Sequence, residues 1–108
     1  MKVRPFEVYE ARANIAKALA HPSRLMILDA LRQKTLCVGE LTKLVGSDQS
    51  TVSKHLAILK ETGLVAVRKK GTQSHYSLRC RCLDGFFGCI EAVLQQNLET
   101  QQALVGAR

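Results

Sequence analysis

The first candidates for chemistry in this chain are its four cysteines, of which Cys80 and Cys82 are separated by a single residue. Thiolates are the ligands that soft ions such as As(III), Sb(III), Cd(II), Pb(II) and Cu(I) prefer. The neighbouring Arg79 and Arg81, together with a helix that we expect to begin at residue 82 or 83, favour the thiolate form at both positions. The pair is therefore a candidate metal-binding site. The alternatives are a redox pair that forms a disulfide and cysteines that are only structural.

Spacing limits which cysteines can act together. On a regular helix, Cys82 and Cys89 share a face but lie about 10.5 Å apart along the axis, at about 1.5 Å per residue. That is too far for both sulfurs to bind one ion at about 2.3 Å. Cys80 and Cys82 point to the same side only where the chain stays extended. We predict a soft-ion site at this pair, completed by Cys37 or by Cys89, the latter from the same chain or from a second copy of it. The plain alternative for Cys89 is a small buried hydrophobe.

The segment VGELTKLVGSDQSTVSKHLAIL, residues 38–59, has the form of two short helices joined by a glycine turn. In the second helix Val52, Leu56 and Leu59 follow the i, i+4, i+7 spacing of a buried stripe. The opposite face carries short polar side chains and a cation, which can reach base edges and phosphates in a major groove. We predict that the DNA-binding residues of this helix are Gln49, Ser50, Thr51, Ser53, Lys54 and His55.

The remaining pattern is that of a mostly α chain with a small β-hairpin. Apolar periodicity and glycine or proline breaks predict helices at about residues 7–20, 23–33, 39–45, 48–62 and 82–102. After Gly63 the period changes to that of strands, and residues 64–78 read as a two-stranded hairpin with a basic tip. A helix-turn-helix followed by such a hairpin is a winged helix. We expect its wing to contact the DNA backbone or minor groove through Arg68, Lys69, Lys70 and Gln73.

The composition is that of one small domain. A length of 108 residues allows a single core, and 46% hydrophobic with 23% charged residues is typical of a globular chain. A formal net charge of +7 attracts polyanions such as nucleic acid. Because we find no membrane-length apolar run and no apolar signal core, we expect a cytoplasmic protein without a membrane partner. We do not expect an enzyme, because no nucleophile–base set or phosphate-binding loop is recognisable.

Four blocks of the sequence, ALAHPSRLMILDAL, LCVGELTKLVG, DQSTVSKHLAILKETGLV and RKKGTQSHYSL, strongly resemble the ArsR/SmtB family of bacterial repressors. The resemblance covers nearly the whole chain. It implies the element order α-α-α-α-β-β-α and a homodimer whose interface is formed by the first and last helices. It therefore makes residues 1–108 a single winged helix-turn-helix DNA-binding domain with dimerisation helices at both ends. The width of the apolar stripe on the last helix agrees, and we expect dimer contacts at Phe86, Phe87, Ile90 and Leu94.

The family resemblance also bears on sensing. Cys37 stands where arsenic and cadmium sensors of the family carry a Cys-x-Cys pair, but the second cysteine is replaced by Gly39. The other site of the family, on the last helix, uses histidines, and this helix has none. The remaining thiol candidates are Cys80, Cys82 and Cys89, with Cys37. Of the histidines, we expect His21 to pack at a helix boundary and His75 to lie near phosphate.

Our hypothesis is a homodimeric repressor that binds double-stranded operator DNA without a cofactor. A thiophilic ion, As(III) first and then Sb(III), Cd(II) or Pb(II), would bind the cysteines and release the operator. The first alternative is a repressor of the same fold that senses thiol oxidation or reactive sulfur. The second is a winged-helix module that binds proteins and has no operator.

Overall fold

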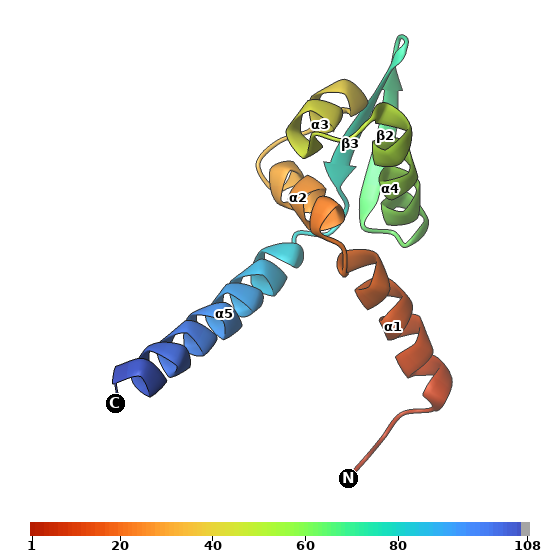
Figure 1. Cartoon of the computed structure of the whole chain (residues 1–108). Helices are drawn as coiled ribbons and strands as arrows, with labels where there is room; N and C mark the ends of the chain where they lie inside the picture. Colours follow the sequence, from red (N-terminus) through yellow and green to blue (C-terminus); the bar gives the residue numbers. More distant parts are fainter. Residues whose placement is uncertain (107–108) are drawn as a thin grey trace.

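The computed structural model describes residues 1–106, which form five helices and a three-stranded antiparallel sheet. Helices α2, α3 and α4 pack with the sheet into a head, from which α1 and α5 diverge as two separate arms (Figure 1). The elements are α1 (Phe6–Leu19), α2 (Pro22–Leu31), β1 (Leu36–Cys37), α3 (Val38–Val45), α4 (Gln49–Glu61), β2 (Val65–Lys70), β3 (Gln73–Leu78) and α5 (Leu83–Gly106). This is the predicted winged helix-turn-helix. The last two residues of the predicted domain lie outside the described residues.

The helix boundaries follow from local side-chain chemistry. Before α2, the Nδ1 atom of His21 accepts a hydrogen bond from the Ser23 main-chain N–H at 3.1 Å, and Pro22 occupies the first helical position. Gly46 ends α3 in the left-handed conformation, with φ of 77°. Asp48 then caps α4 by accepting from the Thr51 N–H at 2.8 Å. Asp48 therefore holds the capping position immediately before α4.

The core lies between α2, α3, α4 and the base of the sheet. The predicted stripe of α4 is confirmed, because Val52, Leu56 and Leu59 are all fully buried. They pack in one cluster with the buried side chains Ile27, Leu28, Leu31, Leu36, Leu41, Leu64, Val65 and Leu83. Leu83 is the one fully buried side chain of α5 among the described residues. The long helix is therefore attached to the head through its first turns.

The sheet contains a third strand, β1, beside the hairpin. We predicted only a two-stranded hairpin, and the structure corrects this to a three-stranded sheet with the order β1-β3-β2. Leu36 pairs with Tyr76 and Cys37 with His75. A two-residue strand is too short to show alternation, so its pairing is not visible in sequence. The added strand connects the start of α3 to the middle of β3.

The two arms expose apolar side chains that the chain itself does not cover. On α1 only Ala18 and Leu19 are buried, and Ile15 is 43% exposed. On α5 the exposed large side chains include Val93, Leu94 and Leu98. This helix runs to Gly106 rather than to the predicted residue 102. Among the described residues, no helix is both long and apolar enough to cross a membrane.

Candidate nucleic-acid interface and cysteine pair

The exposed face of α4 carries most of the residues that we predicted to bind DNA. Gln49, Ser50, Ser53 and Lys54 are exposed, on the side of the helix opposite its buried stripe, and Thr51 is half-buried. The Ser50 hydroxyl donates to Asp48 Oδ1 at 3.0 Å. Because the core fixes the back of this helix, its polar face is held in one orientation. That arrangement suits docking into a major groove.

The N-terminus of α4 is closed by a carboxylate. Hydrogen bonds from Thr51, and then from Ser50, hold the pKa of Asp48 below its usual range, so this group is charged at neutral pH. The Asp48 carboxylate occupies the Thr51 amide at this helix end, and its negative charge disfavours a phosphate there. Lys54 and the wing remain the predicted phosphate contacts.

His55 lies apart from the other predicted DNA-binding residues of α4. It is half-buried, and its Nδ1 atom accepts a hydrogen bond from Arg24 Nε at 3.3 Å. Its ring stands 4.5 Å from that of His21, which is at the predicted helix boundary. Burial foremost, and then the charges of His21 and Arg24, lower the pKa of His55. The structure thus places this side chain at the α1–α2 junction, away from the exposed polar face.

The wing presents its cations on two faces. Arg68, Lys69 and Lys70 on β2 and Gln73 on β3 are exposed, and Gly71 forms the tip with φ of 63°. Alternation places Arg68 and Lys70 on one face, where they help to line a hollow of about 420 Å³ with Thr35, Ala66, Val67, His75 and Ser77. Lys69 occupies the other face. His75, which we expected near phosphate, is half-buried in this hollow beside β1.

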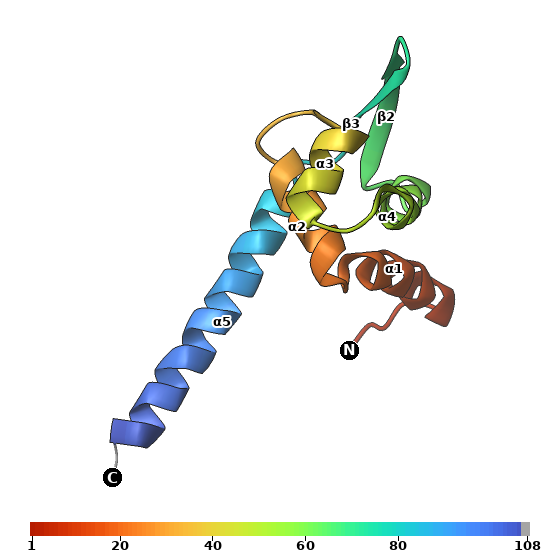
Figure 2. The same cartoon turned by 45° about the horizontal axis from the view of Figure 1, so that its top comes forward.

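The wing extends from the head on the side away from the two arms, whereas α4 lies between the wing and α1 (Figure 2). His55 of α4 contacts His21 and Arg24 at the α1–α2 junction. The wing is therefore separated from the arms that are predicted to form a dimer, but α4 lies close to the end of α1.

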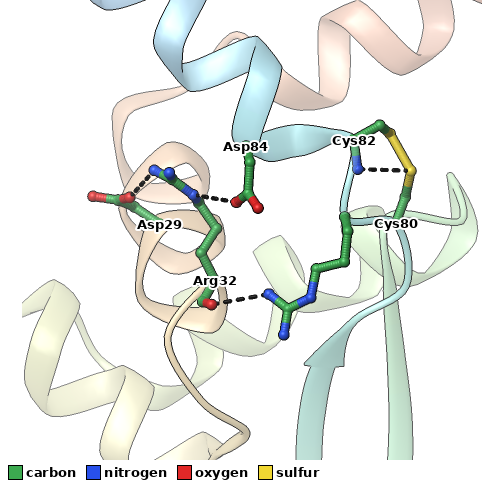
Figure 3. Close-up of polar contacts among 6 residues, drawn as sticks. Asp29, Arg32, Cys80, Cys82 and Asp84 are labelled. Carbon is green, nitrogen blue, oxygen red and sulfur yellow. Dashed lines mark hydrogen bonds and ion pairs between the residues drawn. A yellow bond between two sulfur atoms is a disulfide. The ribbon is translucent and has the colours of Figure 1, made fainter.

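Cys80 and Cys82 are joined in a disulfide between the end of β3 and the start of α5 (Figure 3). Their Cα atoms are 5.3 Å apart, and the Cys82 N–H points to Cys80 Sγ at 3.4 Å. The local spacing thus brings these two sulfurs together, as expected. While the bond exists, neither sulfur is available as a thiolate ligand.

The other two cysteines are not brought to this pair. Cys37 is half-buried before α3, where its main-chain N–H donates to Glu40 Oε1 at 3.0 Å and lowers the pKa of that carboxyl group. Cys89 is exposed on α5 and so is not part of the core of its own subunit. Within residues 1–106, no group of three or more cysteine, histidine or carboxylate side chains is arranged to hold a metal ion. The predicted four-cysteine set is therefore not assembled within one subunit.

A charged cluster next to the disulfide links α2 to α5 (Figure 3). Arg32 donates from Nε to Asp84 Oδ1 and from a terminal nitrogen to Asp29 Oδ1, each at 2.8 Å. Asp84 is the foremost cause of the raised pKa of Arg32. Its guanidinium carbon lies 4.8 Å from the centre of the Phe87 ring. The Arg32 side chain is therefore not a freely solvated charge, because it is only 28% exposed and bridges two helices.

The predicted dimer residues divide into two groups. Phe86 and Phe87 are half-buried against the core of their own subunit, with their rings in edge-to-face contact at 5.8 Å. The Phe87 ring is covered by Arg32, so it serves an internal contact. Leu94 is 61% exposed, whereas Ile90 is half-buried beside it. The exposed apolar surface of α5 thus begins beyond the two phenylalanines.

Comparison with known proteins agrees with this architecture. The sequence model described as "Bacterial regulatory protein, arsR family" matches residues 21–67. The HTH-type transcriptional regulator Rv0081 of Mycobacterium tuberculosis is 32% identical over 99 residues, covering 91% of this chain and 87% of the relative. The biofilm growth-associated repressor of Xylella fastidiosa is 41% identical over 66 residues, covering 61% and 58%.

Solved structures show the same similarity. The crystal structure of Rv0081 superposes with a TM-score of 0.79 at 32% identity, covering 92% of this chain and 98% of the other. The homodimeric winged helix-turn-helix DNA-binding domain Mb0332 of Mycobacterium bovis gives 0.77 at 31% identity, with 93% of each chain covered. The transcriptional repressor BigR of Xylella fastidiosa gives 0.69 at 32% identity, covering 83% and 96%. The chain belongs to the ArsR family of bacterial regulatory proteins, and it is a winged helix-turn-helix DNA-binding regulator of transcription rather than an enzyme.

Proposed function

We propose that this protein is a homodimeric repressor whose affinity for its operator is controlled by the thiol–disulfide state of Cys80 and Cys82. The observation that carries the proposal is the bond between these sulfurs at the base of α5. The reduced dimer binds operator DNA in the cytoplasm, and oxidation releases it. The repressor function is supported by the relatives BigR and the biofilm growth-associated repressor, whose names describe that role.

Operator binding is supported by the exposed polar face of α4 and by the basic wing. Gln49, Ser50 and Ser53 have the donors and acceptors that read base edges, and Lys54 adds a cation for phosphate. Arg68, Lys69 and Lys70 hold the wing on the backbone. A net charge of +7 per chain is doubled in a dimer, which strengthens attraction to DNA. Two recognition helices then meet half-sites about one helical turn apart.

The homodimer is supported by the apolar surface of the two arms. Residues of α1, α2 and α5 line a shared apolar hollow of about 230 Å³, formed by Ala16, Leu19, Ala20, Leu25, Phe86 and Ile90. Beyond it, the exposed side chains of α5 continue the same kind of surface to Leu98. A second copy of the chain would cover both, and the related Mb0332 domain is described as homodimeric.

A purely structural role for the disulfide is disfavoured by its short reach. A disulfide stabilises a fold mainly by restricting the unfolded chain, and the effect grows with the length of the loop that it closes. This one encloses only a single residue, Arg81, between its two cysteines. Its placement instead favours a local switch, because it fixes the segment that leads from the wing into α5.

The redox step is balanced by ordinary thiol chemistry. The thiolate of one cysteine attacks the sulfur of a low-molecular-weight disulfide, and the second cysteine then displaces the remaining thiol. Two protein thiols are oxidised, and one external disulfide is reduced to two thiols. A peroxide performs the same two-electron oxidation through a sulfenic acid, with release of water.

A thiophilic ion is the second candidate effector. Once reduced, Cys80 and Cys82 supply two adjacent soft ligands, which As(III), Sb(III), Cd(II) or Pb(II) prefer. A third thiolate would have to come from Cys37 or from the partner subunit's Cys89. This candidate ranks second because one subunit does not bring three such groups together within the described residues.

The experiment is operator binding under controlled redox conditions. The duplex is first selected by the reduced wild-type protein from a random DNA library, and its Kd is then measured before oxidation, after oxidation and after re-reduction. We expect oxidation to weaken binding at least about tenfold, a typical allosteric coupling, and a reductant to restore it. Both Cys80→Ser and Cys82→Ser should abolish the change, whereas Cys37→Ser and Cys89→Ser should retain it.

Two outcomes would redirect the proposal. An operator Kd that does not change on oxidation, although both thiols are lost, would overturn redox control. Release by As(III) added to the fully reduced protein, without loss on oxidation, would establish the second candidate. The selection also tests the winged-helix interaction module, because failure to enrich any duplex would contradict operator binding itself.

A further inference from the structure

Arg81 is enclosed between Cys80 and Cys82, yet its side chain reaches another helix. Its guanidinium donates to the main-chain carbonyl of Arg32 at 2.9 Å, beside the disulfide shown in Figure 3. The two residues are 49 positions apart in sequence. The contact therefore connects the ring closed by the disulfide directly to the end of α2.

The carbonyl that Arg81 contacts is a natural place for a cation. Arg32 follows the last residue of α2 and caps that helix. Carbonyls at a helix C-terminus lack partners within the helix, and the helix dipole places partial negative charge there. A guanidinium at this position satisfies one such carbonyl and interacts favourably with the dipole. Helix α2 in turn packs Ile27, Leu28 and Leu31 into the core shared with the recognition helix.

A second contact runs in the opposite direction between the same two elements. The Arg32 side chain crosses to Asp84 in the first turn of α5, where a carboxylate also suits the helix dipole. Its guanidinium lies over the Phe87 ring one turn further along. The end of α2 and the start of α5 are thus joined twice, once by each arginine. Only the Arg81 contact originates within the segment that oxidation closes.

We propose that Arg81 is the positioning residue that transmits the redox state of Cys80 and Cys82 to the DNA-binding head. In the disulfide state, the closed ring holds the guanidinium of Arg81 against the end of α2. Reduction opens the ring, frees the backbone of residues 80–82, and releases this contact. The orientation of α5, and with it the spacing of two recognition helices in a dimer, then changes. This inference rests on the proposed redox-controlled repressor.

The chain provides a close control for Arg81. Arg79 flanks Cys80 on the other side and is exposed. It has the same charge at a similar distance from the cysteines, but within the described residues its side chain has no hydrogen bond to α2. We therefore compare Arg81→Ala, Arg81→Lys and Arg79→Ala with the wild type. Two quantities are measured for each, the ratio of operator Kd values between oxidised and reduced protein, and the thiol–disulfide equilibrium with glutathione.

The Kd ratio should fall in Arg81→Ala by about three- to tenfold, the range expected for a charge-assisted hydrogen bond on the surface. Arg81→Lys keeps the charge and a hydrogen-bond donor, so its Kd ratio should lie between those of Arg81→Ala and the wild type. By linkage, loss of a contact made only in the disulfide state makes that state easier to reduce. A tenfold change in the glutathione equilibrium corresponds to about 30 mV. Arg79→Ala should change neither quantity.

Each other result is decisive as well. If the wild type shows no difference between oxidised and reduced Kd, the redox-controlled repressor itself is wrong. If the wild type responds but Arg81→Ala responds equally, only the transmitting role of Arg81 is overturned. If the Kd ratio falls equally in Arg81→Ala and Arg79→Ala, the effect comes from positive charge near the cysteines, and the transmitting role of Arg81 is also overturned. Thermal unfolding of every variant verifies that each is folded.

Discussion

Arg32 and Asp84 connect the end of α2 to the first turn of α5, with 2.8 Å between Nε and Oδ1. Asp29 contacts the same guanidinium at the same distance, but it lies in α2 itself, three residues before Arg32. The two carboxylates are equally exposed, at 56% each. They therefore form a natural matched pair, in which one contact crosses between helices and the other does not.

Asp84→Asn should weaken operator binding by the reduced dimer about two- to fivefold, whereas Asp29→Asn should leave it unchanged. The magnitude is that of an exposed ion pair, and the reason is that Asp84, unlike Asp29, joins α5 to the end of α2. Operator titration of both variants measures the difference. Equal effects of the two substitutions would show that the link between α2 and α5 does not control DNA binding.

Much of the fold was predictable from local pattern. The α4 stripe was visible because Val52, Leu56 and Leu59 follow helical spacing, and Gly46 and Gly63 mark the breaks around that helix. The pairing of β1 was not visible, because two residues carry no alternation. The end of α5 was placed too early, since the polar residues after Leu98 contain no glycine or proline before Gly106.

The candidate site divides in the same way between local and distant relationships. The proximity of Cys80 and Cys82 and the exposed face of α4 follow from spacing over a few residues. The Arg32–Asp84 contact joins residues 52 positions apart, and nothing in the local sequence indicates it. We grouped His55 with the exposed face of α4, but it lies at the edge of the buried stripe, where helical spacing alone does not distinguish an exposed side chain from a half-buried one. Only the fold shows that His21 and Arg24 lie against that edge.

Lys54→Ala should reduce operator affinity while leaving the urea midpoint of unfolding unchanged. Its side chain is exposed on the reading face and contributes nothing to the core. If it contacts one phosphate, the slope of log K against log salt should become shallower by about 0.9. Filter binding over a salt series measures this slope. Leu56 lies on the same helix but is fully buried. Leu56→Ala should therefore lower the urea midpoint, at a cost of about 2–5 kcal/mol in unfolding free energy.

Leu94→Glu should convert the dimer to a monomer at micromolar concentration. The side chain is 61% exposed on α5, and a charge there would be desolvated if a second copy covers it. Gln96→Glu adds the same charge to an exposed position of the same helix, two residues away and so on nearly the opposite face. Sedimentation velocity distinguishes the two. A dimer that survives Leu94→Glu as well as Gln96→Glu would place the interface elsewhere.

Reduction of the disulfide should change operator affinity much more than fold stability. The bond closes a loop of three residues, for which the chain-entropy model gives less than about 2 kcal/mol. Urea unfolding of oxidised and reduced protein, monitored by circular dichroism, measures this difference. A much larger loss on reduction would indicate that Cys80 and Cys82 hold the fold together, and it would contradict their assignment as a switch.

Acidification should destabilise the protein through His55. Its pKa in the folded state is lowered, mainly by burial and then by His21 and Arg24, which face it from the α1–α2 junction. The unfolded chain therefore binds more protons than the folded one as the pH falls below the ordinary value of about 6.5, and stability is lost in that window. Above it, both states are neutral at this residue and the effect disappears. Unfolding free energies of wild type and His55→Gln, measured from about pH 7.5 to about pH 5, isolate this contribution. The glutamine variant keeps a polar side chain but does not titrate, so its stability should fall less steeply on acidification. Parallel curves for the two proteins would assign the acid sensitivity to other groups.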